Sequence, residues 1–297
     1  MSSEIVGFDP VEHCYSWNGW NPPSVSHLLT AAGLNAFDPT WWRKALLRKG
    51  IKPEQAEQWA TDMVWDGINR QEADRWVAQF VDAPMSPDDA EAYMAWRRDS
   101  ATSRGSRIHA RIEHSFNGFE SIPGLLENAN LIARDREWFN AFNDFRIESR
   151  IEEAIAIEKV LINTTGIFCG TVDFAAEIFI PELGDTEPVR RIIDWKTTYP
   201  PDGKVKGKSW QAMQMAAYGA TLNRLEGSGI VEAINVHLYP GGYQITRYDK
   251  DALIKAWQEF LLHLWDFWQE RYLKGLEYHS PQMAALAVER MQQEWMS

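Results

Sequence analysis

The sequence is poor in cysteine and has no long apolar segment. Its 297 residues include two cysteines, Cys14 and Cys169, which lie far apart and belong to no C-x-x-C pair. So few thiols suit the reducing cytosol. No uninterrupted apolar run is long enough to cross a bilayer, and the polar start, residues 1–4, lacks the apolar core of a signal peptide. We therefore expect a cytoplasmic protein with no membrane partner.

Positive charge is also scarce. The formal net charge is -12 at pH 7, so the surface as a whole is not the strongly basic kind that attracts nucleic acid. Basic residues gather locally, at Arg43 and Lys44 and in the run Lys204, Lys206 and Lys208. A basic helix face is more often merely solvated than functional. Any contact with a polyanion must therefore be local.

The lysine run looks at first like a phosphate-binding P-loop. The first glycine of that motif would fall at position 202, which is Asp202, and a start at Gly203 leaves the loop one residue short. A flexible basic loop is the better interpretation.

The most informative segment is the apolar strand pattern of residues 192–198, which carries Asp194 and Lys196. Side chains alternate between the faces of a strand, so these two project to the same side. A surface ion pair is the simple alternative, since such pairs are common and seldom functional.

A second strand pattern, residues 168–177, favours a site. The segment between the two patterns has proline at both ends and glycine between, which predicts a hairpin. Its centre falls between Leu183 and Gly184, which places Asp173 opposite Asp194. Two facing carboxylates repel each other unless a cation lies between them or one is protonated. A hard divalent metal resolves that repulsion.

Two helical segments carry further candidates. His109 and Glu113 share a helix face at spacing i, i+4, as do Gln214 and Tyr218. Taken alone, a histidine on such a helix face is more often structural than a metal ligand. The helix with Gln214 and Tyr218, taken alone, is typical of an ordinary amphipathic helix.

The order of these pieces carries a resemblance. The motifs G-x-x-x-H-x-x-x-E, G-T-V-D, I-I-D-W-K-T-T and Q-M-A-A-Y-G follow one another between about residues 104 and 220. As an ordered set they resemble the PD-(D/E)xK nuclease superfamily, in particular its RecB-like branch, which includes bacteriophage recombination exonucleases and mitochondrial genome maintenance exonucleases.

The resemblance implies roles for individual residues. It makes Asp173, Asp194 and Lys196 the catalytic residues and His109 a metal ligand, with Gln214 and Tyr218 beside the active site and Glu113 as an accessory acid. The shell of one or two Mg²⁺ or Mn²⁺ ions would comprise His109, Asp173, Asp194 and the backbone carbonyl of Trp195. Members with an iron–sulfur cluster need four cysteine ligands, so this chain has no such cluster.

The implied activity is that of a metal-dependent DNA exonuclease in phage-type recombination or genome processing. Its partners would be a single- or double-stranded end of linear DNA and a single-strand annealing protein. The local basic groups named above, with the neighbouring Trp41 and Trp42, are candidate DNA contacts. Two alternatives stay open. One is an endonuclease on the same fold, and the other is a non-catalytic DNA-binding module.

For the fold we expect an α/β (α+β) protein with a restriction-endonuclease-like core, in which helices flank a mixed sheet. Strand patterns cover residues 151–162, 168–179, 189–197, 233–238 and 243–248, and helical ones cover most of 39–118, 127–145 and 249–273. A short hairpin near residues 13–19 leads into a helix capped at Ser24 or Ser26. The simplest division is one nuclease domain over residues 1–297, with a helical elaboration (1–103), a catalytic core (104–248) and C-terminal helices (249–297).

Overall fold

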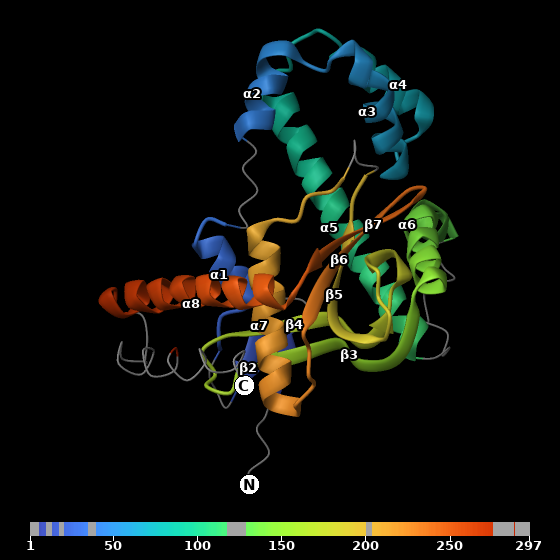
Figure 1. Ribbon diagram of the computed structural model, residues 1–297. Coiled ribbons are helices and arrows are strands. Elements are labelled where there is room, and N and C mark those ends of the chain that lie inside the picture. The colour runs from blue at the N-terminus through green and yellow to red at the C-terminus, as the bar shows by residue number, and fades with distance from the viewer. Residues whose placement is uncertain are drawn as a thin grey trace.

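The computed structural model describes residues 6–9, 14–17, 21–34, 40–117, 129–199, 204–275 and 288. Their elements, in chain order, are β1 (Val6–Asp9), β2 (Cys14–Trp17), α1 (Val25–Ala31), α2 (Thr40–Lys49), α3 (Pro53–Trp65), α4 (Arg70–Ala78), α5 (Pro87–Asn117), α6 (Ala129–Glu148), β3 (Arg150–Ile162), β4 (Cys169–Phe179), the 3-10 turn η1 (Pro181–Leu183), β5 (Val189–Thr197), α7 (Ser209–Glu226), β6 (Glu232–Tyr239), β7 (Gly242–Tyr248) and α8 (Lys250–Leu273). Figure 1 shows their arrangement.

The centre of the molecule is a five-stranded mixed sheet in the order β3-β4-β5-β6-β7. Neighbouring strands are antiparallel except β5 and β6, which run parallel and are joined through α7. The loop between β4 and β5 holds η1 and then Gly184 in a left-handed conformation with φ 79°. A residue without a Cβ adopts that conformation at no steric cost, so the hairpin closes where proline and glycine predicted it.

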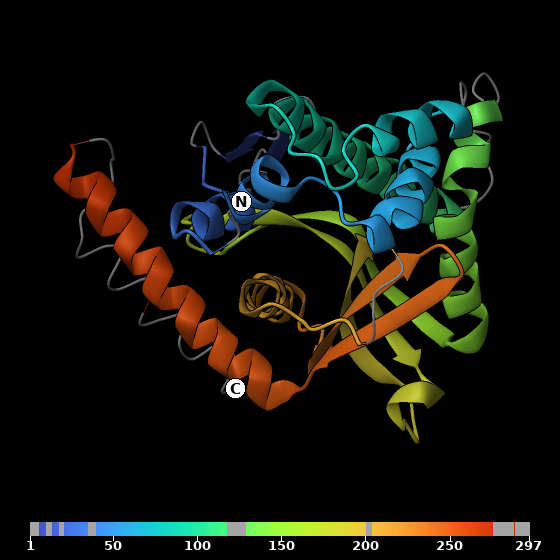
Figure 2. The ribbon, with the colours of Figure 1, turned by 90° about the horizontal axis from the view of Figure 1, so that it is seen from above.

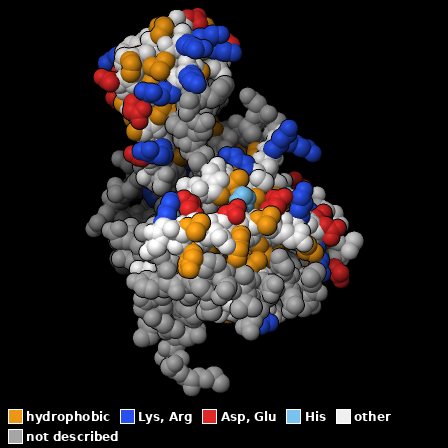
Figure 3. Space-filling model, turned by 90° about the vertical axis from the view of Figure 1, so that its left-hand side faces the viewer, with side chains coloured by type: hydrophobic (Ala, Val, Ile, Leu, Met, Phe, Trp, Pro, Cys, Tyr) orange, Lys and Arg blue, Asp and Glu red, His pale blue; other side chains and the backbone are white. Residues whose placement is uncertain are grey.

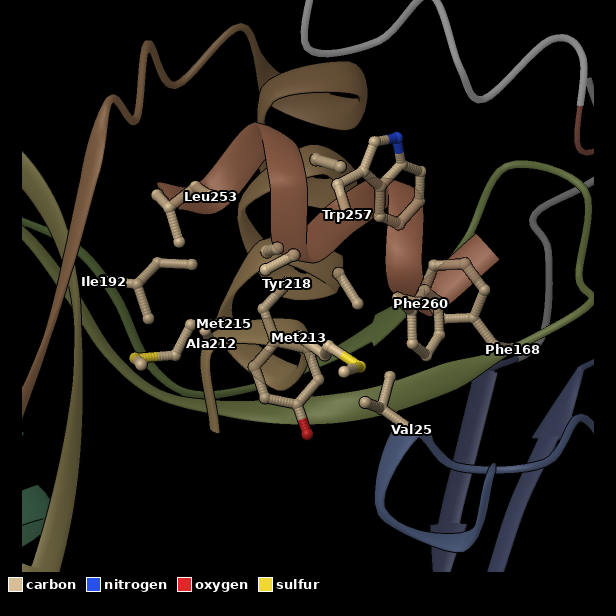
Figure 4. Close-up of a cluster of buried hydrophobic side chains, with 14 of the residues drawn as sticks. Val25, Phe168, Ile192, Ala212, Met213, Met215, Tyr218, Leu253, Trp257 and Phe260 are labelled. Carbon is tan, nitrogen blue, oxygen red and sulfur yellow. The ribbon is translucent and has the colours of Figure 1, made fainter. Parts of the chain in front are cut away.

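Helices cover both faces of the sheet, with α7 and α8 on one side and α6 on the other (Figure 2). On the first side α1, α7 and α8 pack against the sheet, and on the second α5 and α6 do so. Figure 4 shows part of the first core, where Val25, Phe168, Ile192, Ala212, Met213, Met215, Tyr218, Leu253, Trp257 and Phe260 gather. Because Ile192 belongs to this side and Ile193 and Trp195 to the other, Asp194 and Lys196 face α7.

A separate helical part stands above the sheet in Figure 1, formed by α2, α3, α4 and the first half of α5. It has its own apolar core, with Leu46, Trp59, Met63, Val77 and Tyr93 among its buried side chains. The 31-residue α5 leaves this core and continues down to the sheet. The expected boundary between residues 103 and 104 therefore falls inside a continuous helix.

The expected fold class is confirmed, since the structure is a mixed α/β arrangement with helices on both sides of a mixed sheet. The expected small hairpin differs in position. Residues 14–17 form a strand that pairs antiparallel with Val6–Asp9, which lies upstream in the chain. Ser24 caps α1, with its hydroxyl accepting from the His27 amide. Within the described ranges, no helix is long and apolar enough to span a membrane.

Candidate metal centre

Strand β5 presents Asp194 and Lys196 side by side. The Lys196 ammonium donates a 2.8 Å hydrogen bond to Asp194 Oδ1. Asp194 is buried, whereas the Lys196 side chain is about a third exposed. An ammonium that keeps access to the surface while it holds a buried carboxylate is placed to meet an anionic ligand.

Asp173 reaches the same place from β4. The pairing of Phe174 with Ile193 has the register that the turn chemistry predicted, and one step further along it sets Asp173 across from Asp194. The Asp173 carboxylate accepts a 3.1 Å hydrogen bond from the Trp195 amide. Its position is therefore fixed by the backbone of β5.

His109 approaches these acids from α5, together with a residue that the sequence analysis missed. His109 Nδ1 lies 3.4 Å from Glu158 Oε1 and 3.5 Å from Asp173 Oδ2. The ligand atoms of His109, Glu158 and Asp173 all lie within 4.8 Å of one another. One imidazole and two carboxylates at this spacing are a donor set that suits a divalent cation.

Glu158 is unusual in its backbone as well as in its position. It lies on β3 between Ile157, which pairs with Phe174, and Lys159, which pairs with Val172, so it faces Asp173. Its φ is +41°, in the left-handed region that L residues other than glycine seldom adopt. Backbone strain of this kind persists where the surrounding structure holds a residue in place, and such residues cluster at functional sites.

The other ring nitrogen of His109 is already engaged. Nε2 lies 2.9 Å from the Trp195 carbonyl oxygen, which can only accept, so Nε2 carries the proton of this hydrogen bond. Nδ1 is then the nitrogen that faces the acids. The Trp195 carbonyl, which we expected as a metal ligand, accepts this hydrogen bond and so orients the histidine, as backbone carbonyls commonly do for metal-binding histidines.

Burial and the charges of neighbouring groups together shift the pKa values of the titratable side chains at this site. Burial alone would lower the pKa of His109, but Asp173, Glu158 and Asp194 raise it to about 9. Burial raises the pKa of Asp173 to about 7, opposed by His109 and reinforced by Asp194. Although burial would lower the pKa of Lys196, Asp194 and Asp173 raise it, so this side chain stays an ammonium.

Asp194 lies outside the three-residue cluster, and both of its carboxylate oxygens have other partners. Lys196 donates to Asp194 Oδ1. The side-chain amide of Asn235, on the parallel strand β6, donates a 2.5 Å hydrogen bond to Asp194 Oδ2. Asn235 in turn accepts from the Tyr248 hydroxyl at 2.9 Å. This buried chain of donors holds the carboxylate in one orientation, and neither Asn235 nor Tyr248 was a sequence candidate.

The expected accessory residues lie near the centre without joining the cluster. Gln214 donates to the Tyr218 hydroxyl at 3.2 Å. Its own carbonyl oxygen is buried and has no hydrogen-bond partner among the described residues. Tyr218 extends from α7 toward the sheet (Figure 4), and burial, then Tyr15, Asp173 and Asp194, raise its pKa. For Glu113, burial and the neighbouring Glu158 raise the pKa.

Gly170 makes room for Tyr218. A Cβ added to this glycine would lie 2.5 Å from the tyrosine ring, far closer than real contacts allow. The glycine of the G-T-V-D motif therefore permits the close approach of α7 to β4.

The basic candidates are exposed. Lys204, Lys206 and Lys208 lie on the loop between β5 and α7. The Val205 amide of this loop donates a 2.8 Å hydrogen bond to the Gln244 side chain on β7. The ring of Trp210 lies 5.8 Å from Lys196 Nζ and 5.9 Å from Lys208 Nζ. The loop is thus linked to the β5 lysine through one indole.

The other basic candidates lie on the helical part. The exposed Arg43 and Lys44 are on α2, and Arg43 forms an ion pair with Glu91. On this part of the molecule Figure 3 shows basic and acidic side chains intermixed, so it presents no purely basic face in that view. The side chains of Trp41 and Trp42 lie outside the described residues.

Comparisons with known proteins give little. No protein-family model matches the chain, and no curated protein matches it. The crystal structure of SSO0001 is similar over 45% of this chain and 61% of its own, at 13% identity and a TM-score of 0.23. The likeness thus spans about three fifths of that protein, and a score this low carries no weight for fold or function.

Proposed function

We propose that this protein is a Mg²⁺- or Mn²⁺-dependent deoxyribonuclease of the RecB-like branch that degrades linear DNA from an end. The observation that carries the proposal is the cluster of His109, Glu158 and Asp173, whose ligand atoms lie within 4.8 Å of one another beside the Asp194–Lys196 pair. Partly buried acids gathered around one histidine, with an ammonium next to them, suit phosphodiester hydrolysis.

The residues present fit a divalent ion. His109, Glu158 and Asp173 offer one nitrogen and two carboxylate oxygens. Burial first, and then the negative charge of Asp194, raise the pKa of Asp173 to about 7, and a cation would offset both effects. Carboxylates select Mg²⁺ or Mn²⁺, and the imidazole increases the tolerance for Mn²⁺. When bound, such an ion polarises a phosphoryl oxygen and lowers the pKa of water.

The chain's own residues then have separable tasks. His109, oriented by the Trp195 carbonyl, holds Nδ1 toward the acids. Asp194, fixed by Asn235, keeps Lys196 in place through a 2.8 Å hydrogen bond. Lys196 stabilises the charge that develops on the phosphate oxygens and orients the attacking water.

DNA as the substrate is supported by the local basic groups. The exposed Lys204, Lys206 and Lys208 lie on a loop that Trp210 links to Lys196, so backbone phosphates would be drawn toward the centre rather than over the acidic surface. We place the activity in the cytoplasm, in recombination or genome processing beside a single-strand annealing protein. The free, buried thiol of Cys169 suits that reducing compartment.

Digestion of end-labelled linear DNA tests the proposal. Single-stranded, double-stranded and closed circular DNA are incubated with Mg²⁺, with Mn²⁺ or with a chelator. We expect metal-dependent shortening of the linear substrates and an intact circle. Cleavage of the circle would identify an endonuclease, and binding without cleavage under any metal would identify a non-catalytic module.

A further inference from the structure

A second site candidate is a cavity of about 410 Å³ between the helical part and the end of β5. Its lining combines residues of α3 and α5 with Tyr199, which follows β5 directly, and comprises Trp59, Asp62, Tyr93, Met94, Arg97, Arg98, Ala101, Thr102 and Tyr199. Its size is that of a pocket for a small ligand or for one unit of a polymer.

The walls of this cavity are held rigidly. Trp59 and Tyr93 stack with their ring centroids 4.8 Å apart, and both are almost fully buried. The Tyr199 hydroxyl donates to Asp66 at 2.7 Å, and the Arg97 guanidinium lies 4.4 Å from the Tyr199 ring. Tyr93 also stacks with Trp76, at 5.1 Å, so both of its faces are covered and it can meet a ligand only by its edge. A flat ring can pack edge-to-face against rigid aromatic walls without a cost in side-chain ordering.

The polar groups of the cavity suit a neutral ligand with donors and acceptors better than a bare phosphate. Asp62 accepts from Gln58 at 2.7 Å and from Arg97 at 3.3 Å, which leaves lone pairs on both carboxylate oxygens. The negative charge of Asp62 offsets the positive charge of Arg97, so the net positive potential in the cavity is modest. Arg98 adds a second guanidinium to the lining. The edge of a nucleobase carries the donors and acceptors that such a mixed pair can bind.

Helix α5 connects this cavity to the candidate metal centre. Arg98, Thr102, Gly105 and His109 follow at spacings of four, three and four residues, so they lie along one face of the helix. The axial separation between Thr102 and His109 is about 10 Å. Gly105 lies between them and has no side chain, so it adds no bulk to this face. The nearest atom to an added Cβ would be Thr197 Oγ1, at 3.8 Å.

We propose that the cavity binds one unpaired nucleobase of a DNA strand whose scissile phosphate lies at the His109–Glu158–Asp173 centre. The inference rests on the proposed function and deepens it, because it makes single-stranded DNA, or the unpaired end of a duplex, the form that the protein engages. Trp59, Tyr93 and Tyr199 supply the apolar and aromatic walls, while Asp62 and Arg98 read the edge of the base.

Filling the cavity tests the proposal. Ala101 lines it and is exposed, so Ala101→Trp adds an indole without removing core contacts. Ala92 is also exposed on α5, nine residues earlier and about 180° around the helix, so Ala92→Trp is the matched control. Thr102→Trp is a second filling variant in case the first fails to fold. Thermal unfolding of every variant verifies folding.

The readout is binding rather than cleavage. Single-stranded oligonucleotides, each with one 2-aminopurine at a different position, are titrated with the Lys196→Ala protein. Stacking quenches this fluorescent base, so we expect strong quenching at one position and weaker binding, by about 5- to 100-fold, when Ala101 or Thr102 is replaced by Trp. Unchanged affinity and quenching in both folded filling variants would overturn the proposal.

The failure of the proposed function has a different signature. If the unaltered protein hydrolyses neither DNA nor bis(p-nitrophenyl) phosphate with Mn²⁺, the nuclease assignment fails whatever the binding titrations show. If the protein hydrolyses both substrates but the cavity variants bind DNA as tightly as the unaltered protein, the nuclease assignment stands and only the base pocket is excluded.

Discussion

His109 Nε2 lies 2.9 Å from the carbonyl oxygen of Trp195, while His109 Nδ1 faces Glu158 and Asp173. One strand residue therefore fixes which nitrogen of the ring is available for a ligand. A histidine that donates one N–H to a backbone carbonyl has a set tautomer and a more basic second nitrogen. The five experiments below test this arrangement and its surroundings.

Metal binding should release protons. Without metal, the pKa of His109 is about 9 and that of Asp173 about 7, so protons compete with the ion at neutral pH. The apparent affinity for Mn²⁺ should rise with pH from about 6 to about 9, by about tenfold per pH unit for each proton displaced. Calorimetry in buffers of different ionisation heat measures the released protons. An affinity that does not change over this range would contradict the assignment.

Glu158→Gln should weaken Mn²⁺ binding by at least about tenfold, because it removes one of the two carboxylates around His109. Glu113→Gln is the matched control, since Glu113 influences Glu158 electrostatically but lies outside the cluster. Isothermal titration with Mn²⁺ compares the two. Equal effects of both changes would show that only the general negative potential matters.

Asp194→Ala and Lys196→Ala should each reduce DNA cleavage by about 100-fold or more while DNA affinity is largely retained. The first change leaves the Lys196 ammonium without its 2.8 Å partner, and the second removes the cation itself. Lys274→Ala, which removes an exposed lysine paired with Glu270, is the control. Full activity of either variant on linear DNA with Mn²⁺ would exclude the proposed mechanism.

Replacement of Lys204, Lys206 and Lys208 by alanine should weaken DNA binding and flatten its salt dependence. Each lost phosphate contact lowers the slope of log K against log salt concentration by about 0.7 to 0.9. A triple change of exposed lysines, at Lys250 and Lys255 on α8 and at Lys274 just after it, removes the same charge elsewhere. Filter binding over a range of salt concentrations measures both slopes, and equal slopes would contradict a local role for the loop.

Asp185→Asn should destabilise the β4–β5 hairpin. Asp185 accepts from the Ile180 amide and from the fully buried Arg191, so its loss costs about 3–5 kcal/mol, as is usual when one partner of a buried pair is removed. Glu177→Gln breaks the neighbouring, partly exposed pair with Arg190 and should cost at most about 1 kcal/mol. Urea unfolding at pH 7 compares them, and equal losses would be inconsistent with this difference in burial.

The same variant has a pH signature. Burial would raise the pKa of Asp185, but Arg191 and the Ile180 amide lower it overall. The stabilisation is therefore present above about pH 4 and is lost as the pH falls through the lowered pKa of the folded state. The difference between Asp185→Asn and the unaltered protein should shrink in acid.

The sequence predicted the relationship of Asp173 to Asp194 because turn residues fix the register of a hairpin. The same reasoning applied to residues 163–166, between β3 and β4, would have placed Glu158 across from Asp173. The register is regular from this turn to Glu158, since the two register shifts of β3 lie farther from the turn, between Ile151 and Ala156.

Other features had no local signal. Asn235 meets Asp194 through a parallel pairing whose register is set by α7 and by packing, not by a turn. Trp59, Tyr93 and Tyr199 are far apart in the chain, and only the packing of α3 against α5 and of α5 against the sheet brings them to one cavity. Trp59 also belongs to the core of the helical part.

Because α5 is uninterrupted, it fixes the distance between the cavity and the candidate metal centre. From Arg98 to His109 the helix makes three turns without a break, so the spacing between a base in the cavity and the bond to be cut is fixed by helical pitch. A strand would be cut a constant number of nucleotides from the captured base, and its last fragment could be no shorter than that interval. Under the proposed function, the geometry of one helix would thus set the size of the smallest product.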